Sequence, residues 1–444
     1  MATKLDTKQL GSPKRKGDKH PSNGSAAFDY YAAFSHSFVV DLIDYLKPRA
    51  TAILLDPWNG SGTTTTIAAE KGVQAVGLDL NPAMVAISNA RLVSRTLART
   101  TIDRVKRRSL FKGSPQLHAL PDDGLLTWLN PRSVGAFRHV QRYFQEISDE
   151  TTLEFLPEQY RHIQRKRLNL FLNLSLCSAL RSVISSFETS NPTWIPHSLP
   201  VLERVRPKPE TIESALRAFL DIAFDTLASC SNDQLANVTI GEADSRALPL
   251  PSHSVSTVIG SPPYCTRIDY AVATSPELFL LRAVTASTFR ELRDRLLGTT
   301  SISLRRTFEP PREWGRCCLN TIRQISRHPS KASDTYYLKT FLQYFSGLSD
   351  SLRELDRVTT SDGAIALVIQ DSYYKNIHVN LPLIVTEMAQ RMHWYLDKKQ
   401  DYTVRSTLAA SNPKVRSYRD DFTAIESVLI FRKASRSIRR SRRK

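Results

Sequence analysis

Short apolar runs alternate with helical segments between residues 52 and 90. The run Ala52–Leu55 predicts a buried strand, and Thr63–Lys71 predicts a helix that follows a glycine turn. Val73–Leu78 predicts a second strand. The pair Asn81-Pro82 then opens a further helix, with asparagine as its cap and proline in the first helical position. Strand, helix, strand and helix in short succession predict a parallel sheet with helices on both faces.

The sheet pattern is interrupted twice and then resumes. Residues 91–237 have a mainly helical, basic pattern, and residues 266–334 form a second irregular, basic stretch. Further strands are expected at Val238–Ile240, Val255–Ile259, Ala364–Ile369, His393–Leu396 and Ile425–Phe431. A turn is expected at Ser361–Gly363 and a helix at Leu381–Met392. The pattern therefore predicts one α/β sheet domain with two insertions.

The composition is that of a folded protein with an excess of positive charge. The 444 residues are 41% hydrophobic, which excludes a wholly disordered chain. The formal net charge of +18 favours a polyanionic partner over a merely basic surface, because net charge bears on partners rather than on the fold. Eight of the 13 residues from 432 to 444 are basic. Such a tail either adds phosphate contacts without sequence preference or serves solubility alone.

Cysteines and apolar stretches give no sign of metal or membrane binding. The five cysteines include no Cys-x-x-Cys pair, so no structural zinc site is expected. The first 25 residues lack the apolar core of a signal peptide. The most apolar stretch, Leu168–Leu180, is too short and too polar to cross a bilayer. We therefore expect an intracellular protein without a metal and without a membrane partner.

The first predicted strand leads into a glycine-rich turn at residues 56–63. Gly60 and Gly62 allow a tight turn and a close approach of a ligand to the backbone amides, beyond the carboxyl ends of the strands. The turn matches neither the Gly-x-x-x-x-Gly-Lys-Ser/Thr sequence of a nucleoside triphosphate site nor the Gly-x-Gly-x-x-Gly sequence of a dinucleotide site. Instead it begins with Asp56, whose carboxylate would repel a phosphate and attract a cationic ligand.

S-adenosylmethionine is a cationic nucleoside of this kind, because it carries a sulfonium and an ammonium group. Asp79 ends the second predicted strand, where its carboxylate could accept hydrogen bonds from both ribose hydroxyls. Glycine turns alone occur between many strands and helices. The acid at the tip of the next strand is what favours a nucleoside site.

A second group of polar residues surrounds the predicted strand Val255–Ile259. Asp244 precedes this strand and could accept a hydrogen bond from the adenine amino group of the ligand. Ser261-Pro-Pro-Tyr264 follows the strand, on the same rim of the sheet as the glycine turn. The two prolines fix an extended backbone and remove two amide donors, which leaves carbonyl groups and the Ser261 hydroxyl as acceptors. Tyr264 offers a flat face on which a base can stack, although a proline-stiffened turn with a buried tyrosine is the alternative.

The two motifs resemble those of a known enzyme family. Asp56-Pro-Trp-Asn-Gly-Ser-Gly-Thr-Thr64 resembles the cofactor loop of the amino-group DNA methyltransferases of restriction–modification systems. Ser261-Pro-Pro-Tyr264 resembles their catalytic tetrapeptide, in the serine form common among cytosine-N4 enzymes. Adenine-N6 enzymes more often have Asp or Asn in the first position. Tyr30–Leu46 resembles the segment that packs beside the methionine part of the cofactor.

The resemblance implies a fold, a cofactor and partners. The fold is α/β, a Rossmann-like methyltransferase sheet of seven strands with two mainly helical insertions. The cofactor is S-adenosyl-L-methionine, the substrate is double-stranded DNA, and a cognate restriction endonuclease is a candidate partner of a prokaryotic, cytoplasmic, nucleoid-associated protein. No metal is implied. The residues assigned to catalysis are Ser261, Pro262, Pro263 and Tyr264, and those assigned to the cofactor are Asp56, Trp58, Gly60, Gly62, Thr63, Asp79 and Asp244.

The motifs also divide the chain. The expected parts are a disordered basic arm over 1–25, methyltransferase-domain segments over 26–90, 238–265 and 336–431, insertions over 91–237 and 266–335, and a basic tail over 432–444. The order of the motifs resembles one known arrangement of the family. The large insertion between Asp79 and Asp244 departs from that arrangement, so both insertions are candidates for target recognition.

The implied reaction is direct transfer of a methyl group from a sulfonium to an exocyclic amine. Cytosine N4 is a poor nucleophile because its lone pair is conjugated into the ring. Hydrogen bonds from its two protons to the Ser261 hydroxyl and the Pro262 carbonyl would make it more nucleophilic, and alignment with the methyl group supplies the rest. The base must leave the duplex to be reached, and Tyr264 is its expected stacking partner.

Several alternatives stay open at this point. An adenine-N6 enzyme would use the same residues, an RNA amino-group methyltransferase could carry such a tetrapeptide, and a catalytically silent nucleic-acid-binding module could retain both motifs. A cytosine-C5 enzyme needs a nucleophilic cysteine, usually directly after a proline. Cys265 follows Tyr264 instead, which favours a small packing residue over a nucleophile.

Overall fold

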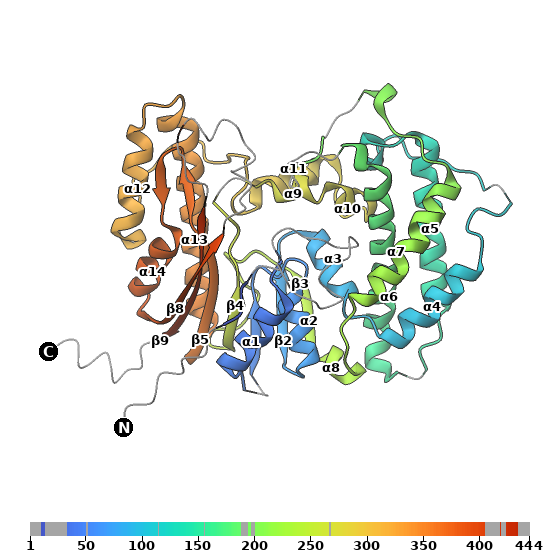
Figure 1. Cartoon of the computed structure of the whole chain (residues 1–444), viewed down its shortest axis with the longest axis horizontal. Coiled ribbons are helices and arrows are strands. Elements are labelled where there is room, and N and C mark those ends of the chain that lie inside the picture. Colours follow the sequence, from blue (N-terminus) through green and yellow to red (C-terminus); the bar gives the residue numbers. More distant parts are fainter. Residues whose placement is uncertain are drawn as a thin grey trace.

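A seven-stranded sheet forms the centre of the fold in the computed structural model (Figure 1). The structure describes residues 10–13, 33–49, 52–113, 115–154, 156–187, 194–196, 200–265, 268–404, 418 and 423–433. In spatial order the strands are β3 (Val238–Glu242), β2 (Ala75–Asp79), β1 (Ile53–Asp56), β4 (Val255–Gly260), β5 (Thr359–Gln370), β9 (Ala424–Lys433) and β8 (Trp394–Val404). The first five are parallel, and β9 is antiparallel to both of its neighbours. The α/β class and the seven-stranded sheet expected from the sequence are confirmed.

Helices cover both faces of this sheet. The helices next to the strands are α1 (His36–Leu46), α2 (Thr63–Glu70), α3 (Pro82–Ala90), α12 (Gly315–Arg327), α13 (Leu338–Val358) and α14 (Leu381–Arg391). Successive residues of β5 alternate between two cores. Ile365 and Leu367 pack in the cluster that includes α13 and α14, whereas Ala366 and Val368 pack in the cluster that includes α1 and α2. Because both faces are buried, the central strands have continuous apolar sequences.

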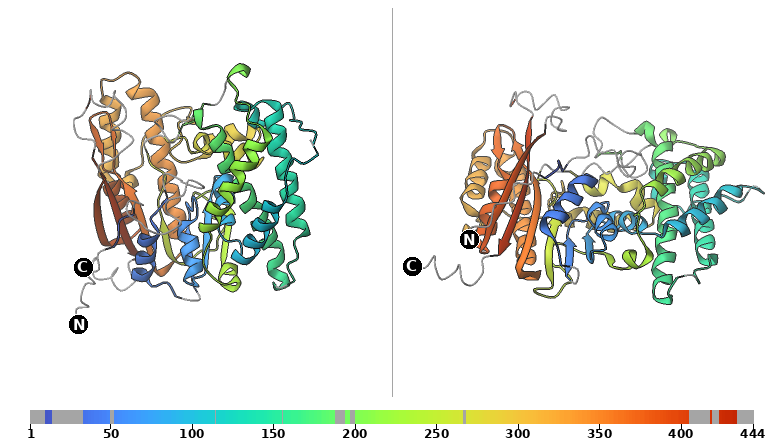
Figure 2. Two further views of the ribbon diagram at one scale, coloured as in Figure 1. Left: turned by 45° about the vertical axis from the view of Figure 1, so that its right-hand side comes forward. Right: turned by 60° about the horizontal axis from the view of Figure 1, so that its bottom comes forward.

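A body of helices lies beyond the β3 edge of the sheet (Figures 1 and 2). It consists of α4 (Arg95–Arg107), α5 (Pro131–Glu150), α6 (Glu158–Val183), α7 (Pro209–Asp225) and α8 (Asn232–Ala236). The segment after the tetrapeptide forms α9 (Tyr270–Ala273), α10 (Ser275–Leu280) and α11 (Ala286–Arg295). Val272, Leu278 and Leu292 of that segment belong to the same buried cluster as Phe137 and Leu172 of the helical body. The two stretches therefore share one core.

Shorter elements complete the described chain. The single-turn helices are η2 (Gly124–Thr127), η3 (Ser185–Phe187), η4 (Val201–Glu203), η5 (Arg312–Trp314) and the π-helical η6 (Ser333–Tyr337). A separate hairpin pairs β6 (Ser372–Tyr374) with β7 (Ile377–Val379).

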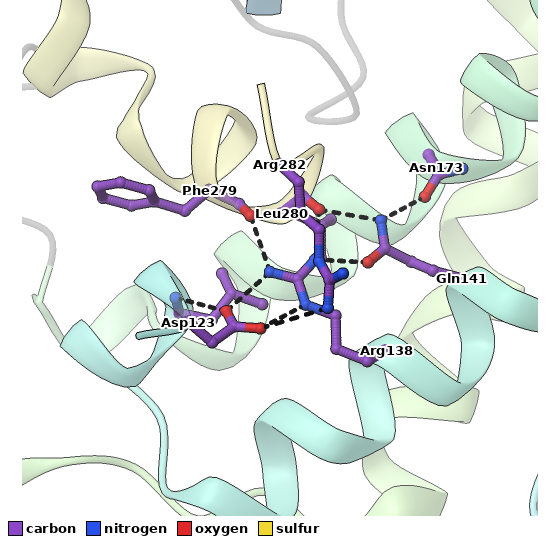
Figure 3. A network of polar contacts seen from close by, with 8 residues as sticks. Asp123, Arg138, Gln141, Asn173, Phe279, Leu280 and Arg282 are labelled. Atoms are coloured by element: carbon purple, nitrogen blue, oxygen red, sulfur yellow. Dashed lines mark hydrogen bonds and ion pairs between the residues drawn. The ribbon is translucent and has the colours of Figure 1, made fainter. Parts of the chain in front are cut away.

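A buried ion pair fastens the helical body to α10 (Figure 3). Arg138 on α5 donates from Nε and Nη2 to the two carboxylate oxygens of Asp123, each at 2.7 Å. Its guanidinium also donates to the carbonyls of Phe279 and Leu280, at 2.9 and 2.5 Å. Gln141 donates to the Leu280 carbonyl at 2.9 Å. Carbonyls at a helix end lack partners within their own helix, so Arg138 caps α10 from the neighbouring body.

The expected turn at Ser361–Gly363 is wrong, because these residues lie inside β5. Thr359 pairs with Val255 whereas Ala364 pairs with Thr257, so the residues between them bulge out of the register. A Cβ on Gly363 would lie 2.5 Å from Cγ2 of Thr359. The extra residues therefore bend the strand at a glycine, which gives the sequence signature of a turn without ending the strand.

The expected strand at His393–Leu396 is too short. β8 continues to Val404, and it pairs with β9 along its length. Residues from Tyr395 to Thr403 alternate between exposed and half-buried. An edge strand of this kind lacks the apolar run that marks the central strands.

The expected arm and tail are only partly described. The expectation of disorder is wrong for residues 10–13: Leu10 is buried, and its backbone N–H and carbonyl bond the side-chain amide of Gln400 at 3.1 and 3.0 Å. Arg432 and Lys433, assigned to the tail, instead end β9. Residues 1–9, 14–25 and 434–444 lie outside the described residues.

No helix in the described part of the chain is long and apolar enough to cross a membrane. Within the same residues, no group of three or more His, Cys, Asp and Glu side chains is arranged to hold a metal ion.

Candidate active site

The carboxyl ends of the parallel strands meet at one rim, where a cleft opens. Asp56 ends β1, Asp79 ends β2, Asp244 follows β3, and Ser261 follows β4. The empty space of the cleft, with its open mouth, is about 940 Å³. Ten of the eleven site residues predicted from the sequence line it, namely Asp56, Trp58, Gly60, Thr63, Asp79, Asp244, Ser261, Pro262, Pro263 and Tyr264.

Gly62, the eleventh predicted residue, shapes the glycine loop without lining the cleft. Its φ is +84°, and a Cβ at this position would lie 2.6 Å from Cβ of Ser88 on α3. Only glycine satisfies both the backbone angle and the close contact. The tight turn lets α2 begin directly at Thr63, at the wall of the cleft.

Asp79 is held by two backbone N–H groups. Gly60 N donates to one of its carboxylate oxygens at 2.8 Å, and Asn81 N donates to the other at 2.8 Å. Burial raises the pKa of Asp79 to about 6, although both hydrogen bonds favour the charged form. Each carboxylate oxygen has room for a second hydrogen bond, so the group is still able to accept from a ligand.

Asp56 lies deeper at the end of β1. Its Oδ1 accepts from the backbone N–H of Trp58 at 3.1 Å. Burial, with a smaller contribution from the charge of nearby Asp79, raises the pKa of Asp56 to about 7. Two carboxyl groups with raised pKa values at the floor of one cleft make a site that a cation would stabilise.

Several polar atoms of the loop are buried without a hydrogen-bond partner among the described residues. They are Nδ2 of Asn59 and the side-chain hydroxyls of Ser61 and Thr63, and all three residues line the cleft. Buried polar groups are usually paired, so orphaned groups at a cleft indicate where the polar groups of a ligand would bind. Together with the two carboxylates, they fit a ligand that has both cationic and hydrogen-bonding groups.

Asp244 differs from the expectation because it already has a partner. Arg246 donates to it from the backbone N at 3.0 Å, from Nε at 2.9 Å and from Nη2 at 2.6 Å. Burial opposes ionisation of Asp244, but the hydrogen bonds and charge of Arg246 outweigh burial and hold its pKa below the usual value. Oδ1 accepts two of these bonds and Oδ2 one, so only Oδ2 keeps ready capacity for an adenine amino group.

The tetrapeptide is held in place from three elements. The Ser261 hydroxyl donates to the Val368 carbonyl on β5 at 2.9 Å. The Tyr344 hydroxyl on α13 donates to the Pro263 carbonyl at 2.9 Å. The backbone N–H of Tyr264 donates to the Tyr270 hydroxyl on α9 at 3.3 Å. These bonds fix the backbone on both sides of Pro262 and orient the serine oxygen as an acceptor.

Sequence reasoning missed the residues that support the tetrapeptide. A Cβ on Gly298 would lie 2.5 Å from the carbonyl oxygen of Tyr264, and Tyr344 is a buried residue 81 positions from Pro263. Neither residue has a local motif, since their roles arise only from long-range packing. Arg246 could have been found from the sequence, because it is an arginine two residues after Asp244, a predicted site residue. Arg246 also lines the cleft.

Cys265 is a buried thiol next to the tetrapeptide. Burial raises its pKa to about 12, even though a hydrogen bond with Ser372 acts in the opposite direction. At neutral pH the group is therefore protonated and lacks the thiolate that a nucleophile requires.

The chain is similar in sequence to type II methyltransferases. It is 24% identical to the type II methyltransferase M.BsoBI of Geobacillus stearothermophilus over an alignment of 293 residues, and the match covers 61% of this chain and 55% of that protein. It is 21% identical to M.AvaI of Nostoc sp. and of Anabaena variabilis over an alignment of 407 residues, and the match covers 84% of this chain and 79% of each relative. The chain thus spans about half the length of M.BsoBI. The methyltransferase relationship predicted from the two motifs is confirmed.

Family models and solved structures give no close match to the chain. No protein-family model matches the chain. Among solved structures, YcgJ from Bacillus subtilis has 9% identity and a TM-score of 0.28, with 89% of this chain and 98% of that chain covered. The rRNA methyltransferase aviRa from Streptomyces viridochromogenes has 11% identity and a TM-score of 0.27, with 92% and 91% covered. The fold assignment rests on the sheet described above.

Proposed function

We propose that this chain transfers a methyl group from S-adenosyl-L-methionine to the exocyclic amine of a base in double-stranded DNA, with cytosine N4 as the target. One observation carries the proposal: the buried carboxylates of Asp56 and Asp79 share a cleft with Ser261-Pro-Pro-Tyr264. The similarity to type II methyltransferases supports the same reaction class. A cognate restriction endonuclease and a cytoplasmic location belong to this proposal.

The loop residues would hold the cofactor. S-adenosylmethionine supplies an electrophilic methyl group on a sulfonium. Asp79, fixed by its two backbone donors, would accept from the ribose hydroxyls, and Asp56 would lower the energy of the positive charge. The orphaned hydroxyls of Ser61 and Thr63 would bind polar groups of the same molecule.

Ser261 and Pro262 would act on the target amine. Because the Ser261 proton is donated to the Val368 carbonyl, the serine oxygen presents lone pairs and accepts one amine N–H. The Pro262 carbonyl accepts the other. Both bonds would concentrate electron density on the nitrogen, which would attack the methyl carbon while the electron pair of the carbon–sulfur bond goes to sulfur. The methylated nitrogen would then release one proton to solvent.

The identity of the methylated nucleoside tests the proposal. The chain would be incubated with unmethylated duplex DNA and isotope-labelled S-adenosylmethionine, and the digested nucleosides identified by mass spectrometry. We expect labelled N4-methylcytosine, and much less of it from Asp79→Ala at a cofactor concentration that does not saturate this variant. N6-methyladenine would move the target to adenine, and label only in RNA would change the substrate. Labelled 5-methylcytosine would contradict methylation of an amine. If the unaltered chain does not bind the cofactor, a catalytically silent nucleic-acid-binding module would be the function that remains.

Cofactor affinity should rise with pH between pH 5 and pH 7.5. The pKa values of Asp56 and Asp79 are raised to about 7 and about 6, so at pH 5 both groups are mostly neutral and attract a cation weakly. Below pH 7, affinity should improve by up to about tenfold per pH unit for each carboxyl group that must ionise. Isothermal titration calorimetry in two buffers should also detect proton release on binding. Asp56→Asn is the control, which should flatten the pH dependence; a flat profile for the unaltered chain would contradict this electrostatic role.

Cys265→Ser should keep most of the methyl-transfer activity. The thiol is buried and its raised pKa keeps it protonated, and transfer to an amine needs no covalent intermediate. Duplex DNA that contains 5-fluorocytosine should therefore form no covalent complex with the chain, as judged by denaturing electrophoresis. An adduct that forms with the unaltered chain and disappears in Cys265→Ser would indicate ring methylation instead.

A further inference from the structure

A second cleft lies on the helical body, between the C-terminal end of α4 and the middle of α5. Its empty space, with its open mouth, is about 1190 Å³, and the charged residues that line it are Arg107, Arg108, Lys112, Arg142 and Glu146. Four cations thus surround one carboxylate. The cleft shares no lining residue with the candidate active site.

The positive charge of this cleft is not neutralised by the protein. On the same helix, Arg104 forms an ion pair with Glu150, and Lys106 forms one with Asp221. By contrast, Arg107, Lys112 and Arg142 are exposed and have no carboxylate within ion-pair distance in the described part of the chain. Cations that a fold leaves unpaired around one hollow attract an anionic partner.

The walls of the cleft are held by fixed contacts. Arg217 donates to the Lys106 and Arg108 carbonyls, at 2.7 and 2.9 Å, and so caps the end of α4. The His139 side chain bonds the Leu110 carbonyl at 2.9 Å. The guanidinium of Arg108 lies 5.1 Å from the centre of the Tyr143 ring. The backbone that presents the unpaired cations is therefore anchored.

We propose that this basic cleft binds backbone phosphates of the DNA duplex beside the target base, without reading sequence. The proposal rests on the proposed function and adds the place where the duplex is gripped. Guanidinium groups suit phosphate oxygens, and a duplex presents a negative charge about every 1.7 Å along its axis. The cleft lies on the helical body, not at the strand ends that hold the tetrapeptide, so its contacts would fall on flanking DNA. An enzyme that flips a base must hold the duplex on either side of it.

Three substitutions together test the proposal: Arg107→Gln, Lys112→Gln and Arg142→Gln. The matched control is the triple variant Arg49→Gln, Lys71→Gln and Arg353→Gln, which removes the same charge from exposed ion pairs outside the cleft. Duplex affinity would be measured by fluorescence anisotropy over a series of salt concentrations. We expect the cleft variant to flatten the logarithmic salt dependence by about 0.9 for each lost phosphate contact, and the control to change it far less.

Duplex length separates flanking contacts from contacts at the target. The cleft variant should bind a long duplex more weakly than the unaltered chain does. It should bind a short duplex, which barely extends beyond the target site, as tightly as the unaltered chain does. The methylated sequence should stay the same. Equal salt slopes for the cleft variant and the unaltered chain would overturn the proposal. Two other results would overturn it. One is that the unaltered chain binds inorganic phosphate at the cleft while the cleft variant binds DNA as tightly as the unaltered chain. The other is that the cleft variant loses affinity for RNA alone. Because affinity is measured without the cofactor, an absence of methyl transfer would count against the proposed function alone.

Discussion

Tyr264→Ala should nearly abolish methyl transfer to duplex DNA while the affinity for S-adenosylmethionine stays within a few fold. The ring of Tyr264 lines the cleft next to the two acceptor groups of the tetrapeptide, where a flipped base would stack. Stacking of a base on an aromatic side chain contributes about 1–3 kcal/mol, so its loss costs up to about 150-fold in base binding. Loss of alignment with the methyl group lowers the rate further. Single-turnover transfer of labelled methyl groups and calorimetric titration of the cofactor measure the two effects separately.

Asp79→Ala is the reciprocal variant and should show the opposite separation. Its carboxylate is bonded by Gly60 and Asn81 on the cofactor side of the cleft, so its removal should weaken binding of S-adenosylmethionine itself. At saturating cofactor, part of the transfer rate should return. Near-normal turnover by Tyr264→Ala on duplex DNA would contradict the assigned roles, as would an equal loss of cofactor affinity in both variants.

The residues that the sequence could reveal are those whose signals are local. The apolar runs of β1, β2 and β4 end in acids or in the serine of the tetrapeptide, and the rule that parallel strands share one rim brings these ends together. The predicted cap of α3 is confirmed, since Oδ1 of Asn81 accepts from the backbone N–H of Ala83 at 3.0 Å. Gly62 was identifiable as a glycine in the turn that follows a predicted strand, and its positive φ and its close contact with Ser88 give the reason why glycine is needed there.

The residues that escaped prediction act through distant partners. Tyr344 bonds a carbonyl 81 positions earlier in the chain, and a tyrosine in an amphipathic helix has the pattern of an ordinary core residue. Leu10 is buried at the far end of the chain beside Gln400, within a stretch whose composition is typical of disorder. Such contacts depend on how the sheet brings together segments that are remote in sequence, which no local pattern encodes.

The shared core of the two inserted stretches is a further result of this kind. Each stretch was interpreted separately as a candidate for target recognition. The buried cluster joins Val272 to Phe137, and Arg138 caps α10, so a change in either stretch would be felt by the other. Tyr270 lies in the same cluster and bonds the backbone of Tyr264. The segment that supports the tetrapeptide is therefore packed against the helical body as well as against the sheet.

Gly298→Ala should lower the turnover number by about 100-fold, because it would displace the tetrapeptide. The φ of Gly298 is +78°, and a Cβ there would lie 2.5 Å from the carbonyl oxygen of Tyr264, which is backbone and cannot rotate away. A shift of about 1 Å in a reacting group is enough to cost roughly 100-fold in rate. The measurement is turnover at saturating cofactor and DNA, expressed per folded molecule after thermal melting of each variant.

Gly113→Ala is the matched control for the backbone strain. Its φ is +85°, and no described atom would lie within 4 Å of the added Cβ. Both variants pay the cost of a left-handed alanine, about 1–2 kcal/mol, so both should melt at a lower temperature. Only Gly298→Ala adds the clash with Tyr264. Turnover that falls equally in both variants, or in neither, would show that Gly298 does not position the tetrapeptide.

Tyr344→Phe provides a second test of whether the tetrapeptide must be held in place, and it can be used if Gly298→Ala does not fold. The substitution removes one hydroxyl, which donates to the Pro263 carbonyl at 2.9 Å, and leaves the buried ring in place. If the tetrapeptide must be held for catalysis, turnover should fall while the affinity for S-adenosylmethionine stays unchanged, since Asp56 and Asp79 are held by other contacts. A purely structural role would instead lower stability without changing turnover per folded molecule. The ratio of the two effects therefore distinguishes a tetrapeptide held in a reactive geometry from one that is merely packed.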